Sequence, residues 1–186
     1  MKQLDAKLLN KFLKIAGSSL EGKWLLVGGT LLPALGIDAR STIDIDLIGL
    51  GRKEADQSLQ LMEIAEQLGL GVETINQAAA FFLKKIKYDE SDLLLLHQGK
   101  SANIYRPPIE LYWKLKIGRL SETDLLDCQQ YYTYCVTKKD PINVKKLAML
   151  LKAASAFDPS PEKSLRLKTL ERLLSVQEYQ SLDNRR

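Results

Sequence analysis

Apolar residues in the first fifty positions follow two different periods. Between residues 3 and 16 they recur at helical spacing, and Gly17-Ser18-Ser19 ends the predicted helix. The short apolar run 24–27 is typical of a buried strand. Residues 43–48 alternate apolar with charged side chains, which is the period of a strand with one face toward a core. The N-terminal part is therefore predicted to mix helix and strand.

Two glycines connect these strands. Gly28-Gly29 is expected to turn the chain, and Thr30 is expected to cap a short helix that stops near Gly36. In the second strand the apolar side chains share the face opposite the charged ones and are expected in the core: Ile43, Ile45 and Leu47.

Helical periodicity dominates the remainder of the chain. Helices are predicted at residues 53–68, 78–86, 107–120, 122–137 and 142–157, and a last helix is predicted from the interruption at 158–161 to about residue 175. Residues 93–96 and 102–105 are predicted to form a hairpin. This order predicts an α+β fold with a small mixed sheet, followed by a C-terminal helical region. The predicted domains are residues 1–106 and 107–186.

Composition places the chain among globular proteins, with 45% hydrophobic and 27% charged residues. The first residues lack the apolar stretch of a secretory signal. The least polar long stretch, residues 24–37, is too short to span a bilayer. A cytoplasmic location without membrane partners is therefore expected.

Cysteine and histidine usage limits the metal chemistry. The single histidine, His97, excludes a site built from several histidines, so any metal is expected to be bound through oxygen. Cys128 and Cys135 are seven residues apart on a predicted helix and are expected to be buried thiols.

The net charge of +4 is unevenly distributed. Residues 138–186 contain 11 Lys and Arg against 6 Asp and Glu, a net of +5, so the preceding residues have a net charge of −1. A basic C-terminal third suits an acidic partner such as RNA. The alternative is that these lysines solvate exposed helix faces.

The strongest candidate for chemistry is the glycine turn followed by Asp-x-Asp. Paired glycines let backbone N–H groups approach an anion closely, and Thr30 adds a hydroxyl donor. Asp44 and Asp46 are two apart on a strand, so both carboxylates project from one face, where they can share Mg²⁺ or Mn²⁺. The structural alternative is that the nearby Arg40 compensates the two carboxylates without a metal.

These residues resemble the signature of the polymerase-beta-like nucleotidyltransferase superfamily. The resemblance is carried by Val27-Gly28-Gly29-Thr30 and by Arg40-Ser41-Thr42-Ile43-Asp44-Ile45-Asp46-Leu47, with 13 residues between Thr30 and Asp44. It implies nucleotide binding by Gly28, Gly29, Thr30, Arg40 and Thr42, and metal binding by Asp44 and Asp46. The Arg-x-Thr-x-Asp-x-Asp form resembles in particular the bacterial minimal nucleotidyltransferases of the abortive-infection toxin type.

A second stretch, from Pro108 to Asp127, resembles the helical segment that follows the core in those proteins. The resemblance implies that Lys114 contacts phosphate and that Asp127, or Asp124 in its place, is a distal acid. The alternative for Lys114 is a surface pair with Glu110, worth about 0.2–0.5 kcal/mol.

The resemblance implies transfer of a nucleoside monophosphate from a nucleoside triphosphate to a hydroxyl acceptor. The acceptor is RNA, a protein side chain or a small molecule; the basic C-terminal third favours RNA, with tRNA as the toxin-like case, and the resemblance adds an antitoxin protein as a partner. The family's third carboxylate has no clear counterpart here; Asp92 is the best candidate, and Asp89, Glu90 and Glu73 compete with it. The alternative function is therefore an inactive nucleotide-binding module that acts through a protein partner.

Overall fold

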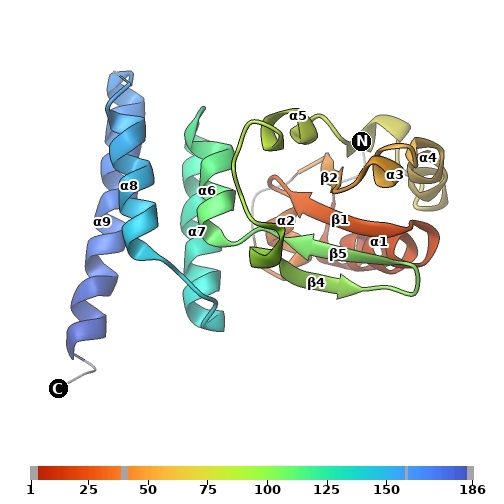
Figure 1. The fold of residues 1–186 in the computed structure, drawn as a ribbon, viewed down its shortest axis with the longest axis horizontal. Coiled ribbons are helices and arrows are strands. Elements are labelled where there is room, and N and C mark those ends of the chain that lie inside the picture. The colour runs from red at the N-terminus through yellow and green to blue at the C-terminus, as the bar shows by residue number, and fades with distance from the viewer. Residues whose placement is uncertain (1–3, 39–41, 158, 184–186) are drawn as a thin grey trace. The chain divides into compact units, whose positions relative to one another are not determined.

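The chain divides into two compact units, which we describe separately (Figure 1). The computed structural model describes residues 4–38, 42–157 and 159–183. The first unit is Met1–Pro108 and contains all the strands described here, and the second, Ile109–Arg186, is helical.

A mixed five-stranded sheet forms the centre of the first unit. Its spatial order is β3-β2-β1-β5-β4, and its strands are β1 (Gly22–Val27), β2 (Ile45–Gly49), β3 (Ile75–Asn76), β4 (Leu94–Gln98) and β5 (Ala102–Arg106). The central strand β1 pairs antiparallel with β2 and parallel with β5. Its residues 24–27 are all buried, which explains their nearly continuous apolar sequence.

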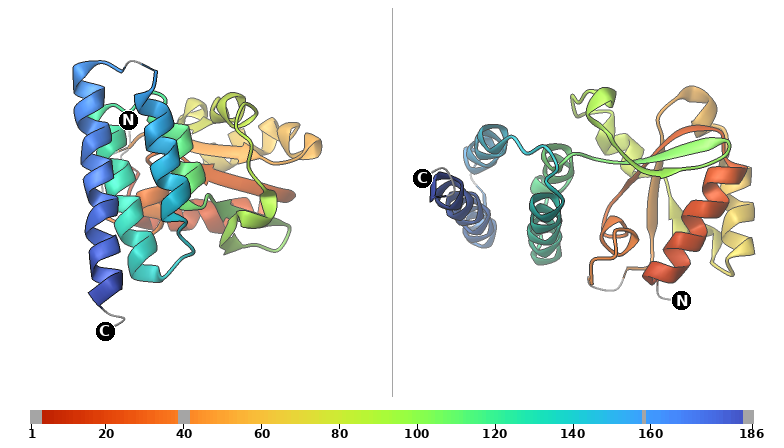
Figure 2. Two further views of the ribbon diagram at one scale, coloured as in Figure 1. Left: turned by 60° about the vertical axis from the view of Figure 1, so that its left-hand side comes forward. Right: turned by 90° about the horizontal axis from the view of Figure 1, so that it is seen from below.

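Helices pack on this sheet. They are α1 (Ala6–Ser19), α2 (Leu31–Ala34), α3 (Arg52–Ala55), α4 (Ser58–Gln67) and α5 (Ala79–Leu83), with single 3-10 turns η1 (Val72–Thr74) and η2 (Glu90–Asp92). The Asp5 carboxylate caps α1 by accepting a hydrogen bond from the Leu8 N–H. Helix α1 packs beside α4 and on β4 and β5, whereas α5 packs on β2 (Figure 2).

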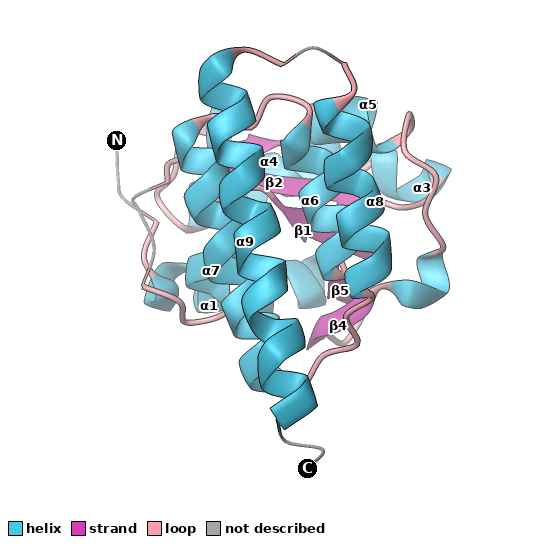
Figure 3. Ribbon diagram, turned by 90° about the vertical axis from the view of Figure 1, so that its left-hand side faces the viewer, coloured by secondary structure: helices cyan, strands magenta, loops and turns pink. Residues whose placement is uncertain are grey.

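The described residues of the second unit form four helices: α6 (Ile109–Ile117), α7 (Glu122–Lys138), α8 (Val144–Ser155) and α9 (Pro161–Asp183). The packed pairs are α6 with α7, α6 with α8, α7 with α9, and α8 with α9 (Figure 3). Ser121 and Asp124 form a reciprocal capping box that starts α7. Cys128 and Cys135 are buried thiols on this helix, as predicted.

The structure confirms the predicted α+β fold with a C-terminal helical region and corrects several local expectations. The helix predicted at 53–68 is interrupted at Asp56 and Gln57, giving α3 and α4. Strand β3 was not predicted. Thr30 makes no capping hydrogen bond to α2, because its own backbone is already helical. Ile43 precedes β2 and is 43% exposed, so only Ile45 and Leu47 are in the core.

None of the helices that the structure describes combines the length and the apolar character that a membrane span needs.

Candidate nucleotide and metal site

The register between β1 and β2 brings the glycine turn beside the aspartates. Val27, the last residue of β1, is paired with Asp46 of β2, and Gly28 follows directly. Gly28 has a φ of 72°, a left-handed conformation that L side chains rarely adopt. The turn therefore needs a glycine here, and it leaves the sheet at the position of Asp46.

The Asp46 side chain lies against Gly28. A Cβ atom built on Gly28 would overlap Oδ2 of Asp46 and would lie 2.8 Å from its Cγ. Gly28 thus has two independent reasons to lack a side chain: its backbone conformation and the space that the carboxylate takes. The glycine turn and Asp46 are therefore in direct contact.

Thr30, at the end of the glycine turn, contacts Asp44. Its side chain is fully buried, and its hydroxyl donates a short hydrogen bond to the backbone carbonyl of Asp44. The hydroxyl of Thr42 lies 3.5 Å from the same carbonyl. The hydroxyl of Thr30 was expected to donate to phosphate; in this structure it donates to the backbone carbonyl of Asp44.

Both aspartates have side chains that solvent reaches. Asp44 is exposed immediately before β2, and Asp46 is half-buried on the strand. Their neighbours Ile45 and Leu47 are fully buried. Carboxylate oxygens are the ligands that Mg²⁺ prefers, and Mg²⁺ is usually bound by one or two carboxylates together with substrate phosphates. The residues therefore fit an ion shared with a triphosphate.

The strand that neighbours β2 carries an amide beside Asp46. Asn76 of β3 is paired directly with Asp46, and its side-chain oxygen accepts a hydrogen bond from the Ala78 N–H at 2.8 Å. Among the residues that the structure describes, no group of three or more His, Cys, Asp or Glu side chains is arranged to hold a metal ion. Asp92, the leading candidate for a third acid, is exposed in η2. Arg40 lies outside the described residues.

The remaining predicted site residues lie in the second unit. Lys114 is exposed on α6, and Asp127 is buried on α7. The carboxylate of Asp127 is 2.7 Å from the ammonium of Lys116, and that of Asp124 is 3.3 Å from the same ammonium. Arg119 donates two further hydrogen bonds to Asp124, at 2.7 and 2.8 Å. Lys116, which was not among the predicted site residues, is the lysine that lies between these two acids.

This cluster shifts the titration of Asp124. Burial raises the pKa of its carboxyl group, but hydrogen bonds from Arg119 and Ser121 and the positive charge of Lys116 outweigh burial, and the net pKa is well below the usual range. Lys116 could have been found from the sequence. It lies three residues after Trp113 and seven after Ile109, so it belongs to the buried stripe of α6, whereas Lys114 lies about 100° away from Trp113.

Comparison of the chain with protein-family models, with curated proteins and with solved structures gave no match in any of the three. We therefore infer its function from its own residues and geometry.

Proposed function

We propose that the protein is a metal-dependent nucleotidyltransferase that moves a nucleoside monophosphate from a nucleoside triphosphate to an acceptor hydroxyl. The observation that carries the proposal is the contact between Gly28 and Asp46, which fixes the glycine turn beside an acidic pair. The sequence resemblance to the nucleotidyltransferase superfamily rests on the same residues.

The residues have separate roles in this proposal. Backbone N–H groups of Gly28 and Gly29 bind the terminal phosphates, since no side chain obstructs the approach. Asp44 and Asp46 bind Mg²⁺, which when bound neutralises phosphate charge and orients the triphosphate. Thr30 holds Asp44 in place through its carbonyl. A phosphate oxygen that approaches this turn is thereby placed next to both carboxylates.

The reaction is a displacement at the α-phosphorus. The acceptor oxygen forms a bond to that phosphorus, the bond to the bridging oxygen of pyrophosphate breaks, and the hydroxyl proton is released to water. The attacking and leaving oxygens lie roughly in line. Pyrophosphate therefore leaves toward the glycine turn while the acceptor arrives from the opposite side.

Ligand-induced stabilisation tests the binding half of this proposal. Mg²⁺ with a nucleoside triphosphate should stabilise the protein by about 2.7 kcal/mol at a hundredfold excess over the dissociation constant. Asp46→Asn should lose most of that shift, because it removes one of the two carboxylates that would hold the metal. A wild-type melting temperature that does not respond to any of the four nucleoside triphosphates with Mg²⁺ would refute nucleotide binding.

Transfer itself needs a second assay. The protein is incubated with each α-³²P-labelled nucleoside triphosphate, Mg²⁺ and total cellular RNA, and label is followed into RNA and into protein. Incorporation that Asp44→Asn and Asp46→Asn both abolish supports the enzyme.

A nucleotide-binding module without transfer activity is the second candidate. The pairing of Asn76 with Asp46 favours it, because the strand position beside Asp46 holds an amide whose oxygen accepts a hydrogen bond from the Ala78 N–H, and an amide cannot take a proton from the acceptor as a carboxylate would. Stabilisation by nucleotide and Mg²⁺ without any incorporation of label would select this function. Asn76→Asp would then be the variant in which to look for gained activity.

A further inference from the structure

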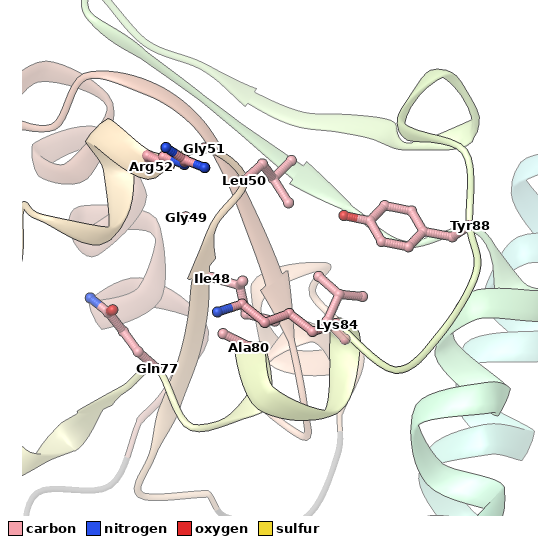
Figure 4. A pocket seen from close by; sticks show the side chains of 10 residues that line it. Ile48, Gly49, Leu50, Gly51, Arg52, Gln77, Ala80, Lys84 and Tyr88 are labelled. Carbon is pink, nitrogen blue, oxygen red and sulfur yellow. The ribbon is translucent and has the colours of Figure 1, made fainter.

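A pocket opens in the first unit at the C-terminal end of β2. It has a volume of about 460 Å³ and is lined by Ile48, Gly49, Leu50, Gly51, Arg52, Gln77, Ala80, Leu83, Lys84 and Tyr88. Its floor is apolar, since Ile48 and Leu83 are buried there beside Ala80. Figure 4 shows the Lys84 side chain running back toward Ile48 and the Tyr88 hydroxyl pointing into the hollow.

The pocket lies on the same face of the sheet as the Asp46 carboxylate. Residues two apart on a strand project from one face, so Ile48 in the pocket wall follows Asp46 at a distance of about 7 Å along β2. The register between β1 and β2 shows where the glycine turn and the pocket lie along β2 relative to Asp46. Asp46 pairs with Val27 beside the glycine turn, and Gly49 pairs with Trp24. The glycine turn and the pocket therefore lie on opposite sides of Asp46.

Two cationic side chains line this pocket. Among the described residues, neither Arg52 nor Lys84 has a hydrogen-bond or ion-pair partner for its side chain, and both are exposed to solvent. Burial raises the pKa of Tyr88, and the nearby Glu90 raises it further, so the phenol stays protonated as a neutral donor. Two cations and one neutral donor around an apolar floor suit a phosphorylated ligand with a flat ring.

An exposed aromatic pair lies on the same helix, α5. Phe81 and Phe82 are 60% and 59% exposed, although helix α5 also supplies two residues of the pocket wall. Their rings meet edge to face at 5.7 Å, and the Lys85 ammonium lies 4.1 Å from the Phe81 ring centroid. Exposed rings interleaved with lysines are the usual platform for stacking the bases of single strands.

We propose that this pocket and the exposed face of α5 bind the acceptor, and that the acceptor is the end of a single-stranded polynucleotide. The inference rests on the proposed function, which places pyrophosphate at the glycine turn. In-line attack then requires the acceptor hydroxyl to approach Asp46 from the side of the pocket. The terminal nucleotide lies on Ile48 and Ala80, with its phosphates beside Arg52 and Lys84, and preceding bases stack on Phe81 and Phe82.

Binding of labelled oligonucleotides tests the assignment directly. Fluorescence anisotropy is measured with fluorescein-labelled single-stranded 12-mers of RNA and of DNA over a series of salt concentrations. Arg52→Gln with Lys84→Gln removes two phosphate contacts, so the slope of log K against log salt should fall by about 1.4, or about 0.7 per contact. Lys53→Gln is the matched control, because Lys53 follows Arg52 on α3 but does not line the pocket.

A second variant tests whether Phe81 and Phe82 stack on bases. Phe81→Ala with Phe82→Ala should weaken binding about 5-fold or more, since one stacked base contributes about 1–3 kcal/mol. Phe157→Ala, which alters an 86% exposed phenylalanine in the second unit, should leave affinity unchanged. The RNA and DNA arms show whether a 2′-hydroxyl is needed.

Stabilisation by nucleoside triphosphate and Mg²⁺ separates this inference from the proposed function. The acceptor site is supported if the Arg52 and Lys84 variant binds the oligonucleotide more weakly but is still stabilised by nucleoside triphosphate and Mg²⁺. If the wild type is stabilised by nucleotide but binds no oligonucleotide, the inference is overturned and the proposed function stands. Loss of nucleotide stabilisation in the Arg52 and Lys84 variant would assign the pocket to the donor nucleotide and also overturn it. Oligonucleotide binding without any response to nucleotide would refute the proposed function, and with it the role of acceptor.

Discussion

The Asp46 carboxylate lies in the space that a side chain at residue 28 would fill, against the Cα atom of Gly28. The contact follows from the pairing of Val27 with Asp46, which places the start of the turn next to the strand position of the acid. A change at residue 28 is therefore a change at the acidic pair.

Gly28→Ala should abolish stabilisation by Mg²⁺ and nucleoside triphosphate, because the new methyl group displaces the Asp46 carboxylate. Gly36→Ala is the matched control. Gly36 has a similar φ of 75°, but apart from its chain neighbours no atom of the described residues lies within 4 Å of an added Cβ. Both variants should lose about 1–2 kcal/mol of unfolding free energy from the left-handed backbone. Differential scanning fluorimetry with and without ligand makes the comparison, and equal ligand responses in the two variants would contradict the role of this contact.

Thr30→Val should loosen Asp44 without altering either carboxylate. Valine keeps the shape of threonine but loses the hydroxyl that donates to the Asp44 carbonyl. The expected loss of unfolding free energy is about 0.5–1.5 kcal/mol, with a weaker affinity for Mg²⁺ and nucleotide. Urea titration measures the unfolding free energy of both variants. Thr42→Val, which removes only the 3.5 Å contact to the same carbonyl, should lower that free energy less than Thr30→Val does. The reverse order would show that Thr42 is the residue that holds Asp44.

Lys116→Met should be the more damaging of two lysine substitutions on α6. It removes the ammonium between Asp124 and Asp127 and leaves two carboxylates with less compensation in a buried setting. Breaking a buried pair in this way costs about 3–5 kcal/mol. Lys114→Met, at an exposed position two residues earlier, should change the unfolding free energy by about 0.5 kcal/mol or less. Urea denaturation at neutral pH measures both; similar losses would contradict the structural role of Lys116.

The same cluster predicts a dependence of stability on pH. The folded pKa of Asp124 is lowered below its unfolded value of about 3.9, so its contribution is present above that value and is lost as pH falls through the folded pKa. The wild type should exceed Asp124→Asn in unfolding free energy at pH 7, and the difference should shrink below about pH 4. Urea midpoints at pH 7, 5, 4 and 3 measure that difference. A difference that stays constant with pH would contradict the lowered pKa.

The elements around the candidate site could be predicted because their sequences carry strong local signals. The run 24–27 is apolar throughout, residues 43–48 alternate, and Gly28-Gly29 separates the two segments. The contact of Gly28 with Asp46 has no such signal. It depends on the strand register, which pairs Val27 with Asp46 and which neither segment specifies alone.

Strand β3 could not be predicted for a different reason. It contains only Ile75 and Asn76, too few residues for any period, and its strand character comes from pairing with β2. The break at Asp56 and Gln57 is also tertiary in origin. The Gln57 side chain accepts a hydrogen bond from the Glu21 N–H at 2.8 Å and donates one to the Glu21 carbonyl at 3.1 Å, contacts 36 residues apart that helical periodicity does not include.

The central strand of the sheet also constrains when the site can form during synthesis. Strand β1 is complete only when β5 lies beside it, and the register places Lys23 next to Asn103, 80 residues later in the chain. Closing so long a loop is entropically unfavourable and slow, so the sheet does not assemble in sequence order. A nascent chain that ends before β4 carries the glycine turn and both aspartates but has an open edge along β1. Until β5 leaves the ribosome, that edge is free to pair with other chains.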